Sequence, residues 1–206
     1  MVPFTTAARE LAEVGRRIDG HGWAPATGGN YSMRLDDGSF AITISGKHKG
    51  RLTEADIMRV DAQGRSLDGN RPSAETGLHM ALYRDFPHIN AVLHGHSPEA
   101  VGLSRAFPDI HDYVFRGHEM LKVLPGFTTH EDEARLPIVD NSQDMDVIDA
   151  AISPLLLAQD RPFAYLIRSH GIYAWGRDIA EAERVLEGVE WLIAAELAER
   201  AFRNGT

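Results

Sequence analysis

The chain contains no cysteine, and this absence restricts its chemistry more than any other feature of the composition. Disulfides and thiolate ligands are excluded, so a transition-metal site must be built from His, Asp or Glu. The composition fits a reducing compartment, and we expect a cytoplasmic protein. The N-terminus has no basic region followed by an apolar run, so the sequence predicts no signal peptide.

Long apolar runs and an excess of positive charge are also missing. No run approaches the roughly twenty apolar residues that span a bilayer, so we expect no membrane segment. The formal net charge of −9 argues against broad nucleic-acid binding through phosphate neutralisation. A small anionic substrate remains compatible, because a local site can oppose the overall field. The 206 residues suit one domain over 1–206.

The hydrophobic pattern predicts an α/β protein. Helices are expected over about 5–20, 73–85, 97–107 and 142–157, and from 178 onward, with Ser73 as one of the N-caps. Strands are expected over 31–35, 40–44, 57–61, 89–94, 164–170 and 171–175. Residues 108–140 are expected to be irregular apart from a short strand-like piece near 136–139. In the last helix, Glu190 is predicted to lie largely outside the buried stripe.

Two histidines stand two residues apart at the end of an apolar run. His94 and His96 follow Ile89–Leu93, and side chains two apart on a strand point to the same face. A third histidine, His170, ends another strand-like run and is again followed by glycine. Three neutral imidazoles with one open position are what a catalytic zinc site requires. Histidine serves other roles more often, so the spacing indicates metal binding without proving it.

Three further segments offer groups that could hold a phosphate. Gly28-Gly29-Asn30 supplies backbone N–H groups and an amide, and Ser45-Gly46-Lys47 adds a hydroxyl and a cation. Ser73 lies at a predicted helix N-terminus, where unsatisfied amides favour anions. Such glycine turns and serine caps usually serve structure. Their occurrence in one chain with the histidines favours a phosphate site near a metal site.

Two carboxylates are candidates for acid/base chemistry. Glu75 belongs to the first turn of its predicted helix, where the helix dipole stabilises a negative charge in any case. Glu119 lies in an irregular segment, and loops held by a rigid scaffold often carry catalytic groups. From the residues alone, a structural role for Glu75 and a surface role for Glu119 both remain open.

Taken in order along the chain, these motifs resemble those of class II aldolase/adducin proteins. The resemblance covers essentially the whole chain and is carried by Thr27–Ser32, Thr43–Gly46, Pro72–Glu75, His94–His96 and Ser169–Gly176. It implies a three-layer α/β/α fold with a central, mainly antiparallel sheet. It also implies one Zn²⁺ per subunit, held by His94, His96 and His170, with iron as an open alternative. Family members are usually homotetramers with sites near subunit boundaries.

A narrower resemblance, to dehydratases of methionine salvage, is carried by His118–Lys122 and Arg168–Gly176. It implies a hydro-lyase acting on a phosphorylated keto-sugar with a methylthio group, and Glu119 as its acid/base. In related aldolases the position of Glu75 takes that part, and this chain has both residues. The phosphate would be held by Gly29, Asn30, Ser45, Gly46 and Ser73. Trp23, Tyr113 or Phe115 could hold the methylthio end.

Three other functions stay open at this point. A sugar-phosphate aldolase or epimerase would use the same two sites, and Glu75 favours it. A metal-free, adducin-like interaction module would have no need for the three histidines. A zinc hydrolase would have no need for the phosphate-binding segments.

Overall fold

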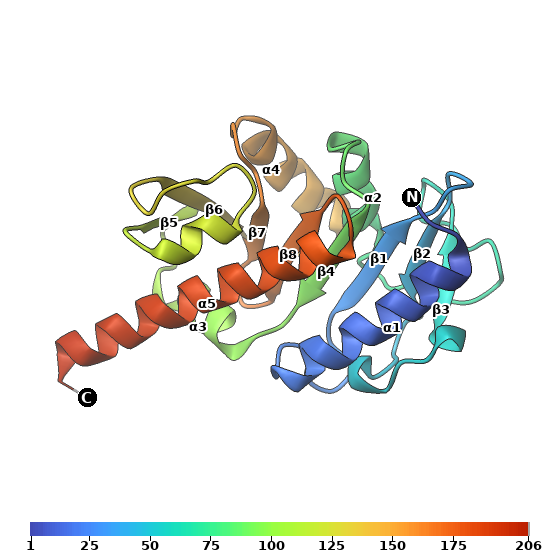
Figure 1. The fold of residues 1–206 in the computed structure, drawn as a ribbon, viewed down its shortest axis with the longest axis horizontal. Coiled ribbons are helices and arrows are strands. Elements are labelled where there is room, and N and C mark those ends of the chain that lie inside the picture. Colours follow the sequence, from blue (N-terminus) through green and yellow to red (C-terminus); the bar gives the residue numbers. More distant parts are fainter. Residues whose placement is uncertain (206) are drawn as a thin grey trace.

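The structure of the protein is a computed structural model that describes residues 1–205 (Figure 1). Its helices are α1 (Phe4–Gly20), α2 (Thr76–Asp85), α3 (Pro98–Ala106), α4 (Met145–Leu157) and α5 (Ile179–Asn204). Its strands are β1 (Asn30–Arg34), β2 (Phe40–Thr43), β3 (Ile57–Val60), β4 (Ala91–Gly95), β5 (Asp112–Arg116), β6 (Glu133–Val139), β7 (Ala164–Ile167) and β8 (Gly171–Gly176). Short 3₁₀ helices are η1 (Lys49–Arg51), η2 (Glu54–Asp56) and η3 (Glu119–Val123).

All of these strands join one sheet, in the order β3-β2-β1-β4-β8-β7-β6-β5. Neighbouring strands are antiparallel except β6 and β7, which run parallel. The expected central, mainly antiparallel sheet is therefore confirmed. β4 lies between β1 and β8, and its His94 is paired with Asn30 on one side and with Tyr173 on the other.

Helices cover both faces of the sheet (Figure 1). Buried side chains of α1, α3 and α5 form one core with the sheet, and those of α2 and α4 form a second. The alternation of side chains along a strand separates the two cores, because Leu93 and Ala174 face the first while Val92 and Trp175 face the second. The three-layer α/β/α fold is confirmed.

The prediction for residues 108–140 was wrong in part. This segment contains β5 and the full length of β6, which together form one edge of the sheet. β5 contains the strand formers Tyr113, Val114 and Phe115, so a local signal was present there and was missed. β6 contains Pro137, which disfavours a strand locally, and its pairing with β5 and β7 holds it in the sheet.

Two predictions about helices also need correction. α2 begins at Thr76 with Glu75 at its N-cap, so Ser73 is not the N-cap; its hydroxyl accepts the Glu75 backbone N–H at 3.3 Å in the preceding turn. Glu190 is buried, because α3 and the end of β4 pack against α5 there, and it accepts a 2.6 Å hydrogen bond from Ser97. Burial raises the pKa of Glu190 to about 7.

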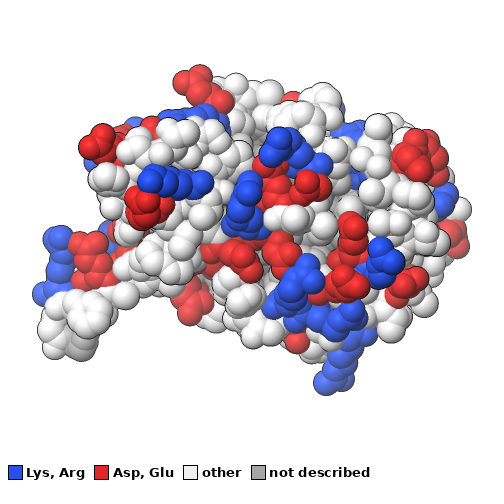
Figure 2. All heavy atoms as spheres, viewed as in Figure 1, with Lys and Arg blue, Asp and Glu red and all other residues white. Residues whose placement is uncertain are grey.

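The surface of the molecule is charged but mixed. On the face covered by α1 and α5, acidic and basic side chains are interspersed (Figure 2). Within residues 1–205, no helix has the length and apolar character needed to cross a membrane.

Candidate metal centre and adjoining cleft

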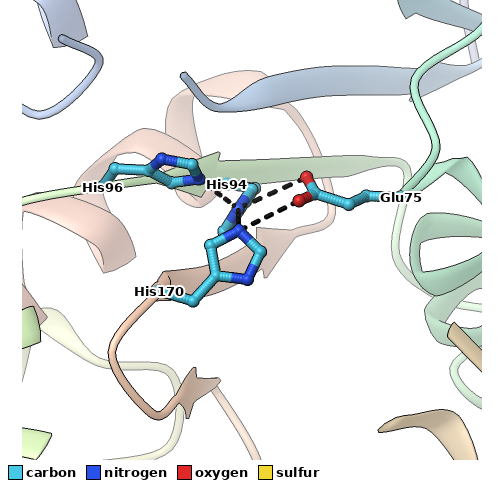
Figure 3. Close-up of side chains that lie close together, drawn as sticks. All are labelled: Glu75, His94, His96 and His170. Atoms are coloured by element: carbon cyan, nitrogen blue, oxygen red, sulfur yellow. Dashed lines mark hydrogen bonds and ion pairs between the residues drawn. The ribbon is translucent and has the colours of Figure 1, made fainter. Parts of the chain in front are cut away.

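Three histidines and one glutamate converge on a single point beside β4 (Figure 3). The Nε2 atoms of His96 and His94 are 2.8 Å apart, and those of His94 and His170 are 3.4 Å apart. Glu75 approaches from the N-terminus of α2, with Oε1 at 2.9 Å from His170 Nε2 and Oε2 at 3.5 Å from His94 Nε2. All four candidate ligand atoms lie within 4.8 Å of one another.

The central strands fix the orientation of His94. Its ring is completely buried and stacks on Tyr173, with ring centroids 4.0 Å apart. Its Nδ1–H donates to the Ile172 carbonyl oxygen at 2.8 Å, so the Nε2 lone pair faces the cluster. Metal-binding histidines commonly use such a second hydrogen bond to select the tautomer that binds the metal.

His96 is held by the backbone around it. The backbone N–H of His96 donates to the Trp23 carbonyl oxygen at 2.7 Å. On the other side lies Gly171, where a Cβ would be 2.1 Å from the Gly95 carbonyl oxygen and 2.9 Å from Cδ2 of His96. A larger residue than glycine at position 171 would therefore displace β4 or the His96 ring.

His170 lies in the turn between β7 and β8, and Arg168 fixes that turn. The Arg168 guanidinium donates to the carbonyl oxygens of Ser104, Phe107 and Ile110, at 2.7, 3.0 and 2.8 Å. These carbonyls lie at and beyond the C-terminal end of α3, so the turn is attached to that helix. Ser169 has a left-handed backbone conformation, with φ of 58°, that brings His170 back toward the cluster.

The electrostatics of the cluster suit a divalent cation. Burial keeps the pKa of His94 well below its usual value, and burial together with His170 lowers the pKa of His96 to about 4. Burial alone would raise the pKa of Glu75, but hydrogen bonds from His170 and Asn30 and the nearby His94 hold it below its usual range. Neutral imidazoles beside an ionised carboxylate form a donor set that binds Zn²⁺ and related metals. The residues fit a metal ion.

An open cleft of about 280 Å³ adjoins the cluster. The predicted phosphate-binding residues all line it: Gly29, Asn30, Ser45, Gly46 and Ser73. Glu75 and His96 of the histidine cluster line it as well. Gly29 has φ of 76°, and a Cβ there would lie 2.5 Å from the His94 carbonyl oxygen. Glycine is thus required where the cleft approaches the metal-binding strand.

The cation of the cleft is Lys49 rather than Lys47, which the sequence motif had indicated. Lys47 points away and pairs with Asp56 at 2.8 Å. Lys49 is only 2% exposed, lines the cleft, and donates to the carbonyl oxygens of Thr27 and Lys47 at 2.9 and 2.7 Å. An ammonium group has three N–H bonds, so one remains for an anion. Burial, partly offset by Glu75, lowers the pKa of Lys49 to about 8.

The other predicted site residues lie outside both the cluster and the cleft. Glu119 begins η3, is 71% exposed, and pairs with Lys122 at 2.5 Å; it lines neither the cluster nor the cleft. Phe115 is fully buried in the first core and Tyr113 is nearly so, with its hydroxyl donating to Glu196 at 2.7 Å. Trp23 supports His96 through its backbone. None of the three aromatic residues lines the cleft.

Sequence reasoning also missed a buried residue behind the site. His79 is 0% exposed and lies against Asn30, on the side of the amide away from the cleft. Its spacing of four residues from Glu75 would place both on one helical face, and this was the available signal.

The fold and this combination of a histidine cluster with an adjoining cleft are those of a metal-dependent class of proteins, and comparison identifies the family. A profile described as "Class II Aldolase and Adducin N-terminal domain" matches residues 9–197. The chain therefore belongs to the class II aldolase and adducin family. It is 49% identical over 193 residues to the methylthioribulose-1-phosphate dehydratase of Methylococcus capsulatus, covering 94% of each chain. It is 47% identical over 203 residues to that of Acidiphilium cryptum, covering 97% of this chain and 94% of the relative.

Solved structures agree with this assignment. YgbL of Klebsiella pneumoniae superposes with a TM-score of 0.82 at 25% identity, covering 96% of this chain and 91% of its own. The L-fuculose-1-phosphate aldolase of Thermus thermophilus superposes with a TM-score of 0.77 at 25% identity, covering 96% and 95%.

Replacement of one imidazole should remove the metal. We expect His94→Ala to retain less than about a tenth of the divalent metal that the wild-type protein binds, because the three remaining donors are all partly solvent-accessible and lose their buried neighbour. His88→Ala, at an exposed position outside the cluster, is the matched control and should keep full occupancy. Metal content is measured by mass spectrometry after gel filtration. Full occupancy in His94→Ala would contradict the assignment of the ligands.

Removal of the buried cation should weaken anion binding. A hydrogen bond to a charged group contributes about 1.5–3 kcal/mol, so Lys49→Met should bind inorganic phosphate roughly ten- to a hundredfold more weakly. Lys47→Met removes an exposed lysine two residues away and should leave the affinity unchanged. In the wild-type protein, Lys49 is charged below its pKa of about 8, so affinity should fall as the pH rises through that value. Calorimetric titration at several pH values tests both statements, and equal losses in the two variants would contradict them.

Proposed function

We propose that this protein dehydrates 5-methylthioribulose 1-phosphate to 2,3-diketo-5-methylthiopentyl 1-phosphate in methionine salvage, with Zn²⁺ as its metal. The main support is near-full-length identity of 47–49% to relatives named for this reaction. The His/Glu cluster and the cleft beside it supply the two things the substrate demands: a metal site for its oxygens and a cradle for its phosphate. A cytoplasmic location is part of the proposal, since a sugar phosphate does not cross a bilayer freely.

The reaction removes water across two neighbouring carbons. A base takes the proton from the carbon that bears a hydroxyl next to the ketone, and the hydroxyl of the following carbon leaves with a proton from a general acid. The resulting enol tautomerises to the diketone. Zn²⁺ bound by His94, His96 and His170 would supply Lewis acidity that stabilises negative charge on the substrate oxygens. Gly29, Asn30, Ser45, Gly46, Ser73 and Lys49 would hold the phosphate and fix the distance from it to the reacting carbons.

The two candidate carboxylates suit different roles. Glu75 is held ionised within the histidine cluster, so it is a weak proton acceptor and a good fourth donor to the metal. Glu119 is outside the cluster and exposed, which leaves it free to meet another chain. We assign proton transfer to Glu119, acting at the site of a neighbouring subunit in a homotetramer.

A direct assay tests the reaction. Zinc-loaded protein incubated with methylthioribulose 1-phosphate should yield a product lighter by one water, and chelation of the metal should abolish it. General acid–base assistance contributes about two to four orders of magnitude, so Glu119→Gln should lose roughly that factor in kcat. Mass spectrometry follows the products. An unchanged substrate with metal-loaded wild-type protein would refute the proposal.

Mixed assemblies test whether Glu119 acts across a subunit boundary. The His94→Ala chain lacks a metal ligand but keeps Glu119, whereas the Glu119→Gln chain has the reverse. Co-expression of the two, with different tags, should regenerate about a quarter of the sites with both functions if subunits assort at random. Activity no greater than that of the separate variants would place Glu119 in its own subunit's site or outside the mechanism.

The second candidate is a sugar-phosphate aldolase. It is favoured by the position of Glu75 at the metal cluster and by the structural likeness to the Thermus thermophilus aldolase. In that case the same assay would give cleavage of a phosphorylated sugar into two carbon fragments, and Glu75→Gln would lose more activity than Glu119→Gln.

A further inference from the structure

A chain of buried hydrogen bonds runs behind the site and reaches it at Asn30. It begins at Tyr83, whose hydroxyl lies 2.9 Å from that of Ser32. Ser32 Oγ is 2.7 Å from His79 Nδ1, and His79 Nε2 contacts Asn30 Oδ1. Ser32 and His79 are 0% exposed and Asn30 is 2% exposed, so water cannot substitute for any of these partners. The chain crosses from the second core to the wall of the cleft.

The donor-to-acceptor direction of these hydrogen bonds follows from their end at Glu75. Asn30 Nδ2 lies 2.5 Å from Glu75 Oε2, and an ionised carboxylate only accepts hydrogen bonds. The amide nitrogen of Asn30 must therefore face Glu75, which leaves its oxygen facing His79. A reversed amide would place two acceptors in contact at Glu75 and cost the buried carboxylate a donor.

The tautomer of His79 follows in turn. Because Asn30 Oδ1 is an acceptor, His79 Nε2 carries the hydrogen, and Nδ1 accepts from the Ser32 hydroxyl. The Ser32 oxygen can then accept from the Tyr83 hydroxyl. Burial lowers the pKa of His79 to about 3, so the ring is neutral, as this arrangement needs. Each donor in the chain points toward the catalytic cleft.

The same amide also determines what Ser73 can do. Its hydroxyl oxygen receives the second Asn30 N–H at 3.2 Å and the Glu75 backbone N–H at 3.3 Å. With both lone pairs engaged, the hydroxyl hydrogen of Ser73 is left for an acceptor. Ser73 lines the cleft, so under the proposed function that acceptor would be a phosphate oxygen.

We propose that His79 is a positioning residue, which holds the Asn30 amide in one of its two orientations and thereby orients both the Glu75 carboxylate and the Ser73 hydroxyl. The inference rests on the proposed function for its catalytic consequence, but not for its structural content. The Asn30 amide connects the metal side of the site to the phosphate side, and His79 orients that amide from behind the cleft.

The tautomer is tested first, on the zinc-loaded protein without substrate. Nitrogen-15 histidine spectra should show His79 neutral, with its hydrogen on Nε2, throughout pH 6–8; His79→Gln identifies the signal by its loss. A hydrogen on Nδ1, or a charged ring, would reverse or break the chain and overturn the proposal. This readout does not depend on which reaction the enzyme catalyses.

Two substitutions then separate positioning from packing. His79→Gln keeps an N–H donor and an acceptor, whereas His79→Leu keeps only volume. We expect His79→Leu to lose at least tenfold in affinity for inorganic phosphate and at least tenfold in kcat/KM. We expect His79→Gln to recover most of both. Tyr165→Phe, which removes a hydroxyl from the same core away from the chain, is the matched control and should change neither.

The outcomes distinguish the two proposals. Unchanged phosphate affinity in folded His79→Leu, or equal losses in the Leu and Gln variants, would make His79 a packing residue and overturn the inference. A wild-type enzyme that does not dehydrate the substrate, yet shows the expected tautomer and phosphate affinities, would refute only the proposed function. Circular dichroism confirms that each variant is folded.

Discussion

The pairing of β4 with β1 and β8 is the constraint on which the rest of the site depends. It places Asn30, His94 and Tyr173 side by side across three central strands. His94 lies near the end of β4 and His96 follows it, while the turn after β7 brings His170 to the same point. A shift of β4 by one residue would reverse the face of every side chain on it and dismantle both the metal cluster and the cleft wall.

The sequence was sufficient to select the three histidines that converge in the candidate metal centre. Strand alternation predicts a shared face for His94 and His96, and the His-Gly setting of His170 marks the turn from β7 into β8. The residues that line the cleft were also predictable, because glycine at a positive φ and a serine near a helix start are typical of exposed backbone and hydroxyl groups. These features depend on residues close together in the chain, and local patterns report them well.

Other features depend on contacts that no local pattern encodes. The sequence does not distinguish Lys47 from Lys49. The path of the chain into η1 buries Lys49 and leaves Lys47 exposed. Glu190 was predicted outside the buried stripe of α5 but meets Ser97 from another element. Pro137 weakens the local strand signal of β6, which is held in the sheet by its pairing with β5 and β7. Glu119 receives a role only from the resemblance, because within one chain it lies outside both the cluster and the cleft.

The central sheet has a further consequence for the entropy cost of metal binding. His94 is carried by β4, His96 follows directly after that strand, and His170 is carried by a turn fixed to α3 through Arg168. The ligands are thus ordered when the chain folds, so binding an ion costs little conformational entropy. In small zinc-dependent domains, by contrast, capture of the ion and folding are one event. Here the fold itself brings the four candidate donors together.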